Sequence, residues 1–383
     1  MDRKTALEKL RERFEAEKQM LTQRFTEQLE LHLDALVAAV YGAIGTMDSP
    51  DSVRIIQIQV MRTDVYQGKS RIIVCGYNEN WYLDERHWQS EVDAQYLYEP
   101  FAEAALRLAK ELSMYMGAVT DYDVRNLVCE HFVKCFSEQA VRVRNHFALF
   151  DEWAETQGLS FTVPYRILWG AYREQAETLF YMDKKHKGTK EFQAELKDNN
   201  LFRSFVESSV SDTEISGKNF AFLNMKGSAL ERVSFAACVF GQSLFIKASA
   251  QWCQFRKCMF YGCNWNQTDG YQMDFGGAQI VNTAFEDMKL RKGKFDGAVL
   301  TGVSFYGSVL EECSFQNATL TRVDLRLASM ENIDFTGAVL QDVYVHYKDA
   351  DKLALTEEQS EHVYVLEEEV TDQSRTLHLL QSP

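Results

Sequence analysis

The sequence predicts a multidomain α+β protein with three parts: a mainly helical N-terminal domain that contains a small β-hairpin, a repeat domain, and a short C-terminal cap. Helical periodicity with two interposed β-like runs fills residues 1–205. A strict five-residue periodicity then governs residues 206–345, and neither pattern continues into residues 346–383. We therefore place the domain boundaries at these positions.

Composition indicates a globular, cytoplasmic protein. Of the 383 residues, 46% are hydrophobic and 25% are charged, which excludes global disorder. The charged start MDRKTALEKLRERFEAEK lacks the apolar run of a secretory signal, and no run of apolar residues is long enough to span a membrane. Eight cysteines in such a chain are expected to be free thiols.

The acidity of the chain lies mostly outside the repeats. The net charge is −15, which would suit a partner with a basic surface or a mimic of nucleic acid. Residues 214–345 hold 12 Lys and Arg against 13 Asp and Glu, a net charge of −1. The remaining −14 is shared by the two flanking regions.

Residues 2–45 are predicted to form one or two amphipathic helices. Their apolar stripe consists of Leu7, Leu10, Phe14, Leu21, Phe25 and Leu29. This stripe packs on its own domain or serves as the seam of a coiled-coil homodimer, although Lys18 and Gln28 interrupt a strict heptad.

The rest of the N-terminal domain is predicted as a hairpin followed by helices. Residues 53–62 and 71–75 alternate as strands do, and NWYLDE (80–85) is a candidate third strand. The pattern is then helical over 91–117, 123–155 and 164–185, with Pro164 suited to a first helical turn. KKHKGTKEFQAELKDNN is interpreted as the exposed exit of this domain.

Every fifth residue from Ile215 to Val345 is large and apolar, except Ala250 and Gly270. These 27 sites follow one another without an insertion, which indicates a repeat architecture. The residue two positions earlier in each unit is usually small or compact, as at Ala278, Ala298 and Cys313.

Units such as AVLTG, VSFYG, CSFQN, ATLTR, VDLRL and IDFTG resemble those of the pentapeptide-repeat proteins, written A-(D/N)-L-x-x. The resemblance covers about a third of the chain, and the N-terminal domain has no counterpart in it. It implies a right-handed, quadrilateral parallel β-helix, in which each pentapeptide forms one face and four form a coil.

Coils of twenty residues would stack the central residues into columns that fill the cylinder. The expected core side chains are Phe235, Phe255, Phe275, Phe295, Phe315 and Phe335; Phe240, Phe260, Leu300 and Leu320; and Phe245, Trp265, Phe285 and Phe305.

The fourth column lacks side chains at Ala250 and Gly270, which would leave a void. We expect Trp252, Trp265 or Tyr271 to lean into it, or the face to bend, in preference to a ligand pocket.

Both ends of a β-helix need covers, because unpaired strand edges promote aggregation. The N-terminal domain is expected to cover one end. Thr356 and Gln359 have the spacing of a capping box and predict a short helix that covers the other.

No catalytic, cofactor-binding or metal-binding set is found. Cys253, Cys258 and Cys263 occupy small inward positions on different faces, so they are expected to be structural. Cys129, His131 and Cys135 also give no convincing ligand set, because only the last two share a helix face.

Lys289, Arg291, Lys292 and Lys294 form the one basic cluster of the repeats. They would straddle a corner of the β-helix. This cluster is a solvated surface or a small positive patch for an acidic partner or a nucleic-acid backbone.

The sequence therefore favours a non-enzymatic interaction or scaffold protein with an unidentified protein partner. The resemblance adds an alternative, because some pentapeptide-repeat proteins mimic DNA and bind DNA gyrase or another type II topoisomerase. The near-neutral repeats and the long N-terminal domain count against it, and direct binding of nucleic acid is not expected. An enzyme within residues 1–205 and a bacterial effector delivered into another cell are further alternatives.

Overall fold

The computed structural model describes residues 2–198, 200–350 and 353–366. Contacts divide the chain into two compact units, Met1–Met182 and Asp183–Pro383. The division therefore lies earlier in the chain than the boundary expected near residue 205.

The first unit is an α+β fold. Its strands are β1 (Ile55–Val60), β2 (Arg71–Tyr77), β3 (Trp88–Asp93), β4 (Tyr165–Ala171) and β5 (Ala176–Met182). Its helices are α1 (Arg3–Gly45), α2 (Arg62–Gln67), α3 (Gln95–Lys110), α4 (Asp121–Glu138), α5 (Ala140–Arg144) and α6 (Phe150–Thr156), with short 3-10 helices at Pro50–Ser52, Trp81–Leu83, Leu112–Tyr115 and Asn145–Phe147.

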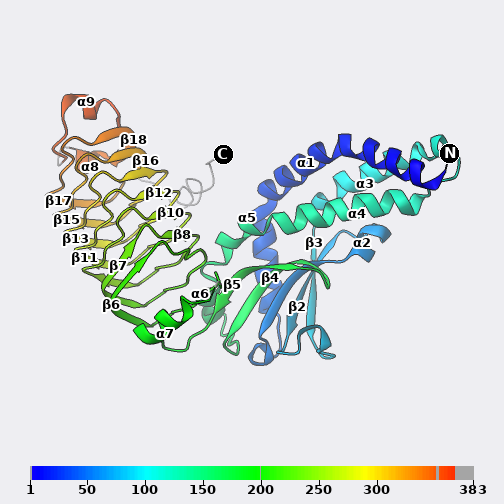
Figure 1. Ribbon diagram of the computed structural model, residues 1–383, viewed down its shortest axis with the longest axis horizontal. Coiled ribbons are helices and arrows are strands. Elements are labelled where there is room, and N and C mark those ends of the chain that lie inside the picture. The colour runs from blue at the N-terminus through cyan, green and yellow to red at the C-terminus, as the bar shows by residue number, and fades with distance from the viewer. Residues whose placement is uncertain (1, 199, 351–352, 367–383) are drawn as a thin grey trace. The chain divides into compact units, whose positions relative to one another are not determined.

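A five-stranded mixed sheet in the order β3-β2-β1-β4-β5 forms the centre of this unit. The pairs are antiparallel except β1 and β4, which are parallel. Helices α1, α3 and α4 pack on one another, and α4 also contacts β4 (Figure 1). There the ring of Trp169 stacks on Phe136 at 4.0 Å between centroids, which anchors the helical layer to the sheet.

Residues 3–45 form one continuous helix, whose apolar stripe is buried within the same chain. Leu10, Phe14, Leu21, Phe25 and Leu29 are all nearly inaccessible to solvent, while Leu7 is half-buried. The stripe faces α3 and α4, and Phe25 meets Phe101 and Phe132 edge to face. Of the two predicted roles of this stripe, the structure therefore supports packing within its own domain.

Two predictions for this unit are wrong. Residues 164–185 form strands β4 and β5 rather than a helix, and Pro164 precedes β4. A short, continuous apolar run fits a buried strand as well as a helix, and β4 is covered by a neighbour on each edge. The third strand is Trp88–Asp93, whereas NWYLDE contains the 3-10 helix Trp81–Leu83.

The second unit is a parallel β-helix with short helices at its ends, which confirms the predicted fold. Its helices are α7 (Thr189–Glu195), α8 (Tyr347–Ala350) and α9 (Glu357–Ser360). Its strands are β6 (Ser209–Ser216), β7 (Ala229–Ala236), β8 (Val239–Gly241), β9 (Ser249–Gln251), β10 (Met259–Tyr261), β11 (Asp269–Tyr271), β12 (Gln279–Val281), β13 (Lys289–Arg291), β14 (Val299–Thr301), β15 (Val309–Glu311), β16 (Thr319–Asp324), β17 (Ser329–Glu331), β18 (Val339–His346) and β19 (Val363–Leu366).

Residues twenty apart pair throughout the β-helix. Phe260 lies between Phe240 and Ile280, and the isolated bridges keep the same spacing, as between Ser234 and Gln254. Two seven-stranded parallel sheets result, which are visible as stacked ribbons in Figure 1. The chain therefore adopts the predicted arrangement, in which each pentapeptide forms one face and four pentapeptides form one coil.

The central side chains stack inside the cylinder. Successive rings from Phe235 to Phe335 lie 4.8 to 5.2 Å apart and nearly parallel. The other expected core side chains are also buried. Neighbouring columns meet edge to face, as Phe275 and Phe285 do at 5.9 Å. The interior is therefore an ordered stack of aromatic and aliphatic side chains.

The corners of the cylinder use left-handed backbone. Every fifth residue from Glu207 to Asp342 has a φ between about 47° and 72°. Glycine, asparagine and aspartate occupy half of these corners, as at Gly217 and Asn282, since they tolerate this region best. The corner is thus two residues after the central one, and the small inward residue follows it.

Methionines fill the gap in the fourth column at Gly270, where the sequence suggested Trp252, Trp265 or Tyr271. Trp265 instead stacks on Phe245 in the third column, at 3.8 Å between centroids. A Cβ placed on Gly270 would lie 2.5 Å from Met273 Sδ and 2.9 Å from Leu290 Cδ1. Met288 Cε is also close, at 3.3 Å. The expectation of local compensation holds, but Trp252 is 44% exposed and Tyr271 half-buried. Flexible methionines, placed where other units have small residues, reach into the space.

The small inward residues also hold the coils together by hydrogen bonds. The Cys258 thiol donates to Phe235 O at 3.3 Å, and the Cys263 thiol donates to Phe240 O at 3.1 Å. The hydroxyl of Thr268 makes the same contact with Phe245 O at 2.8 Å. Cysteine, serine and threonine recur at this position because each supplies a compact donor to the coil below.

Short helices cover the ends. Phe192 of α7 stacks on Phe220, and Thr189 Oγ1 accepts a hydrogen bond from Ser211 N. The segment interpreted as an exposed exit is therefore the N-terminal cover. At the other end Thr356 opens α9 with the predicted capping box, and Gln359 Nε2 donates to the carbonyls of Phe335 and Ala338. Residues 367–383 of the predicted C-terminal cap lie outside the described residues.

The filled fourth column yields a test by compensation. Met273→Ala removes buried volume and should lower the free energy of unfolding by about 2–5 kcal/mol. Gly270→Leu alone should also destabilise, by about 1–3 kcal/mol, because Met273 occupies its space. Together the two changes should cost less than their sum. Urea unfolding of the full chain measures this, and Met259→Ala at an exposed site should change the free energy by under about 0.5 kcal/mol.

The cysteines yield a test by alkylation. All eight are free and buried in the described residues. Burial raises the pKa of Cys253 and Cys313 to about 11, whereas a hydrogen bond from the Cys258 thiol lowers the pKa of Cys238 to about 7. Because the thiolate is the reactive species and the thiols are buried, iodoacetamide at pH 7.5 should label the native protein slowly, and Cys238 should be the first to react. After unfolding in guanidinium, intact mass should report eight adducts. Fewer than eight without a reductant would indicate a disulfide and contradict this account.

Candidate interaction surface

Each pentapeptide places two side chains on the outside of its face, one on each side of the inward central residue. Because coils lie about 4.8 Å apart, outward residues twenty apart form straight ladders along the cylinder. The chemistry of each face can therefore be taken directly from two ladders of the sequence.

One face carries two ladders without any charge. It is the outer surface of strands β8, β10, β12, β14, β16 and β18, and we call it the uncharged face. Its twelve outward residues are Val239, Gly241, Met259, Tyr261, Gln279, Val281, Val299, Thr301, Thr319, Thr321, Val339 and Gln341.

Large apolar side chains are exposed along the uncharged face. They are Met259, Tyr261, Val281, Val299 and Val339, with exposed fractions of 37 to 60%. The ring of Tyr261 lies across Gly241, where a Cβ would come within 2.1 Å of the ring. The surface is therefore regular and uncharged over six consecutive coils, with exposed large apolar side chains in four of them, and exposed apolar surface is a feature of binding sites.

The other three faces carry charges. The opposite sheet has Glu231, Asp269, Lys289, Arg291, Glu311 and Glu331 at the equivalent positions. The two remaining faces have Arg256, Asp274, Lys294, Asp296 and Asp334, and Lys226, Glu286, Asp324 and Arg326. The absence of charge is thus a property of one face and does not follow from the repeat. The uncharged face can be recognised in the sequence, but only when the outward positions are sorted by face.

The basic cluster straddles a corner, as expected from the register. Lys289 and Arg291 project from β13, Lys292 occupies the left-handed corner, and Lys294 begins the next face. All four are exposed, but two have partners. Lys292 Nζ lies 3.8 Å from Glu312 Oε2, and the Arg291 guanidinium lies 5.7 Å from the centre of the Tyr271 ring. The cluster is therefore a partly neutralised surface.

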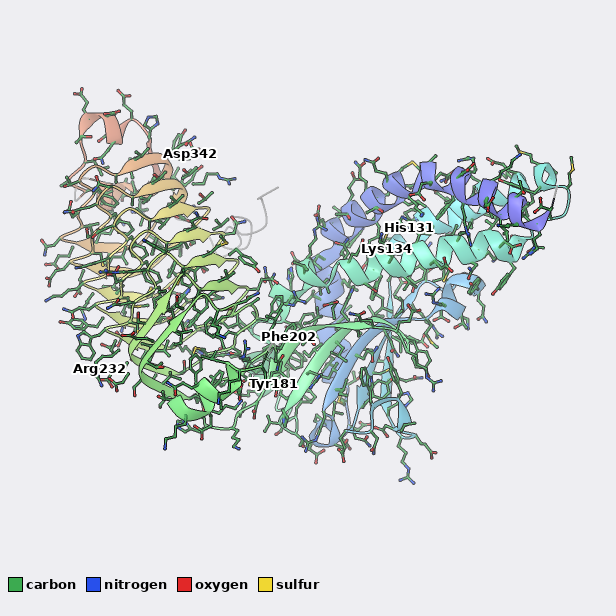
Figure 2. All side chains as sticks on the ribbon, viewed as in Figure 1. His131, Lys134, Tyr181, Phe202, Arg232 and Asp342 are labelled. Atoms are coloured by element: carbon green, nitrogen blue, oxygen red, sulfur yellow. The ribbon has the colours of Figure 1, made fainter. Side chains whose placement is uncertain are left out.

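The candidate ligands of the first unit do not converge. His131, on α4 (Figure 2), has Nε2 3.1 Å from Lys18 O, 3.2 Å from Thr22 Oγ1 and 3.7 Å from Cys135 Sγ. Cys129 points elsewhere, with Sγ 3.9 Å from Arg62 O. Burial lowers the pKa of His131 and raises the pKa of Cys135, so both are neutral near pH 7. This pair therefore lacks the thiolate and imidazolium of an activated nucleophile.

Within residues 2–198, 200–350 and 353–366, no group of three or more His, Cys, Asp or Glu side chains has the arrangement of a metal site. Cys253, Cys258 and Cys263 belong to different faces, and their thiols donate to backbone carbonyls. Cys238 and Cys258 lie on adjacent coils of one face, where Cys238 N donates to Cys258 Sγ at 3.4 Å. Among the same residues, no helix combines the length and apolarity that crossing a bilayer requires.

Comparison with known proteins identifies the repeats. The family model for pentapeptide repeats matches residues 278–317 and 304–342, with 8 copies. No curated protein matches the sequence.

Several solved structures match the chain in part. Full-length QnrB1, a plasmid-mediated fluoroquinolone resistance protein, is 15% identical with a TM-score of 0.20, and the match covers 44% of this chain and 98% of that one. HetL, a pentapeptide repeat protein involved in heterocyst differentiation regulation in the cyanobacterium Nostoc, is 12% identical with a TM-score of 0.14, over 41% and 97% of the two chains. Rfr23 of the cyanobacterium Cyanothece is 14% identical with a TM-score of 0.14, over 41% and 94%.

The family match falls within the uninterrupted register that pairs residues twenty apart. The repeat region of this chain is a pentapeptide-repeat β-helix.

Proposed function

We propose that this chain is a non-enzymatic interaction protein that binds a protein partner on the uncharged face of its β-helix. The observation that carries the proposal is the pair of charge-free ladders on one face beside charged ladders on the other three. Burying charged groups costs more free energy than burying apolar ones. Of the four faces, this one therefore has the lowest desolvation penalty when a partner covers it. Free cysteines throughout the described residues agree with a cytoplasmic location.

The size of the face constrains the partner. Six coils spaced about 4.8 Å apart span about 24 Å, and three strand residues span about 10 Å. Such a strip is smaller than the roughly 800 Å² per partner of a standard interface. The partner must therefore also contact the corners or a neighbouring face, or bind transiently.

The first unit is proposed to hold or direct the β-helix. A homodimer through the stripe of α1 is not part of this proposal, because α3 and α4 already cover that stripe. The 43-residue helix still offers exposed charged residues, such as Arg11 and Glu12, to a second partner.

The test compares two faces of the same full-length protein. Val281→Asp with Val299→Asp places two charges on the uncharged face, and Ser249→Asp with Ser329→Asp places two on the opposite sheet. All four sites lie outward, so thermal unfolding should change little in either variant. A photo-crosslinking residue at Thr301 should capture a partner from the source cells, and only the valine variant should abolish the capture. Equal capture by both variants would refute the proposal.

Binding to DNA gyrase or another type II topoisomerase is the alternative implied by the family. A DNA mimic needs closely spaced negative charge, since duplex DNA carries one charge per about 1.7 Å. The uncharged face and the mixed signs of the other faces offer no such row. We therefore expect purified protein to leave gyrase supercoiling unchanged. Inhibition or protection that persists in the Val281→Asp, Val299→Asp variant would favour mimicry over the proposed face.

A further inference from the structure

Trp252 occupies one of the left-handed corners that recur at every fifth residue of the β-helix. Its φ is 54°, in the left-handed region that bulky residues rarely adopt, and 44% of the residue is exposed. It does not fill the fourth column, because Met273 and Met288 do so. Its ring meets Tyr271 edge to face at 5.7 Å, and the exposed part of the ring is available to a ligand.

Trp252 lines a groove that crosses three coils. The groove has a volume of about 540 Å³. Its lining is Asp212, Thr213 and Glu214 from the first coil, Arg232, Val233 and Ser234 from the second, and Trp252 and Gln254 from the third. Thr213 and Val233 are buried and form its floor. The groove lies at a corner of the charged sheet opposite the uncharged face.

The charge of the groove is negative, because its cation is already paired. Arg232, which projects outward from the β-helix (Figure 2), donates from Nε to Asp212 Oδ1 at 2.6 Å and from a second nitrogen to Asp212 Oδ2 at 3.1 Å. Its third nitrogen pairs with Glu231. The carboxylates of Asp212 and Glu231 thus pair with one guanidinium, and Glu214 adds a further carboxylate to the groove.

Of the acidic residues in the groove, Glu214 is the one whose carboxylate is available to a ligand. It is exposed, and among the residues that the structure describes its carboxylate has no hydrogen bond or ion pair. It shares the groove with the Trp252 ring, so a carboxylate and an aromatic surface are offered together. One coil further, the Tyr271 ring meets Trp252 edge to face at 5.7 Å, and the Arg291 guanidinium of the following coil lies over that Tyr271 ring.

We propose that this groove binds a basic peptide segment of a protein partner. An arginine or lysine side chain of that segment lies against the Trp252 ring, and its charge meets the Glu214 carboxylate. Cations are attracted to the faces of aromatic rings, and tryptophan binds them best. The surplus of carboxylates repels nucleic-acid backbones and favours a cation over a neutral sugar. The site is separate from the uncharged face, so either proposal can fail without the other.

The probe is a fluorescein-labelled hexa-arginine peptide, titrated into the full-length protein at low salt and followed by anisotropy. The same peptide with citrulline in place of arginine keeps the shape and removes the charge. We expect the arginine peptide to bind and the citrulline peptide not to bind. Trp252→Asn and Glu214→Gln should each weaken binding about tenfold or more. Trp252→Asn should leave the melting temperature unchanged or higher, since asparagine suits the left-handed corner.

Matched changes elsewhere distinguish this groove from general attraction to an acidic protein. Glu312→Gln removes one charge from the same column of corners outside the groove, and Leu327→Asn changes another exposed corner residue with a φ of 55°. Both should bind the peptide as the unaltered protein does. Equal weakening by Glu312→Gln and Glu214→Gln would overturn the proposal, as would wild-type binding by Trp252→Asn. So would binding of maltohexaose or chitohexaose that depends on Trp252 but not on Glu214.

Discussion

The stacking of each coil on the one twenty residues before it is the interaction on which the second unit depends. Backbone hydrogen bonds fix the separation of the coils, and that separation places the rings from Phe235 to Phe335 in parallel contact. The compact inward donors add one more hydrogen bond to the same interface, as from Thr268 to Phe245 O. Because the interior is made by register, the outward residues are free to vary face by face.

That freedom explains how one protein can carry two different surfaces. Val281 and Val299 lie on a charge-free face, whereas Arg232 and Glu231 lie on the sheet behind it. The inward Ile280, Leu300 and Leu230 are alike in both places. Binding chemistry in this unit is therefore decoupled from folding, and substitutions outside the cylinder can change the partner at little cost in stability.

The β-helix could be predicted from the sequence because its spacing is local and strictly periodic. The side chain that fills the space above Gly270 could not be predicted, because Met273 lies on the next face and reaches this space around a corner. The same limit applied to Trp252, which seemed suited to the gap when only its distance along the chain was known. In the first unit, the strand Tyr165–Ala171 was predicted as a helix because its apolar run has no clear period. Only its pairing with β1 and β5 shows that this segment is a strand.

Because the register is unbroken, residue number gives the position of each coil along the axis of the β-helix. From residue 215 to residue 345 no unit is longer or shorter than five residues, so position along the axis is a linear function of residue number. Deleting or duplicating a block of twenty residues would shorten or lengthen every face by one coil of about 4.8 Å and leave both end covers unchanged. The reach of a surface ladder is thus set by counting coils, in discrete steps that evolution or an engineer can add one at a time.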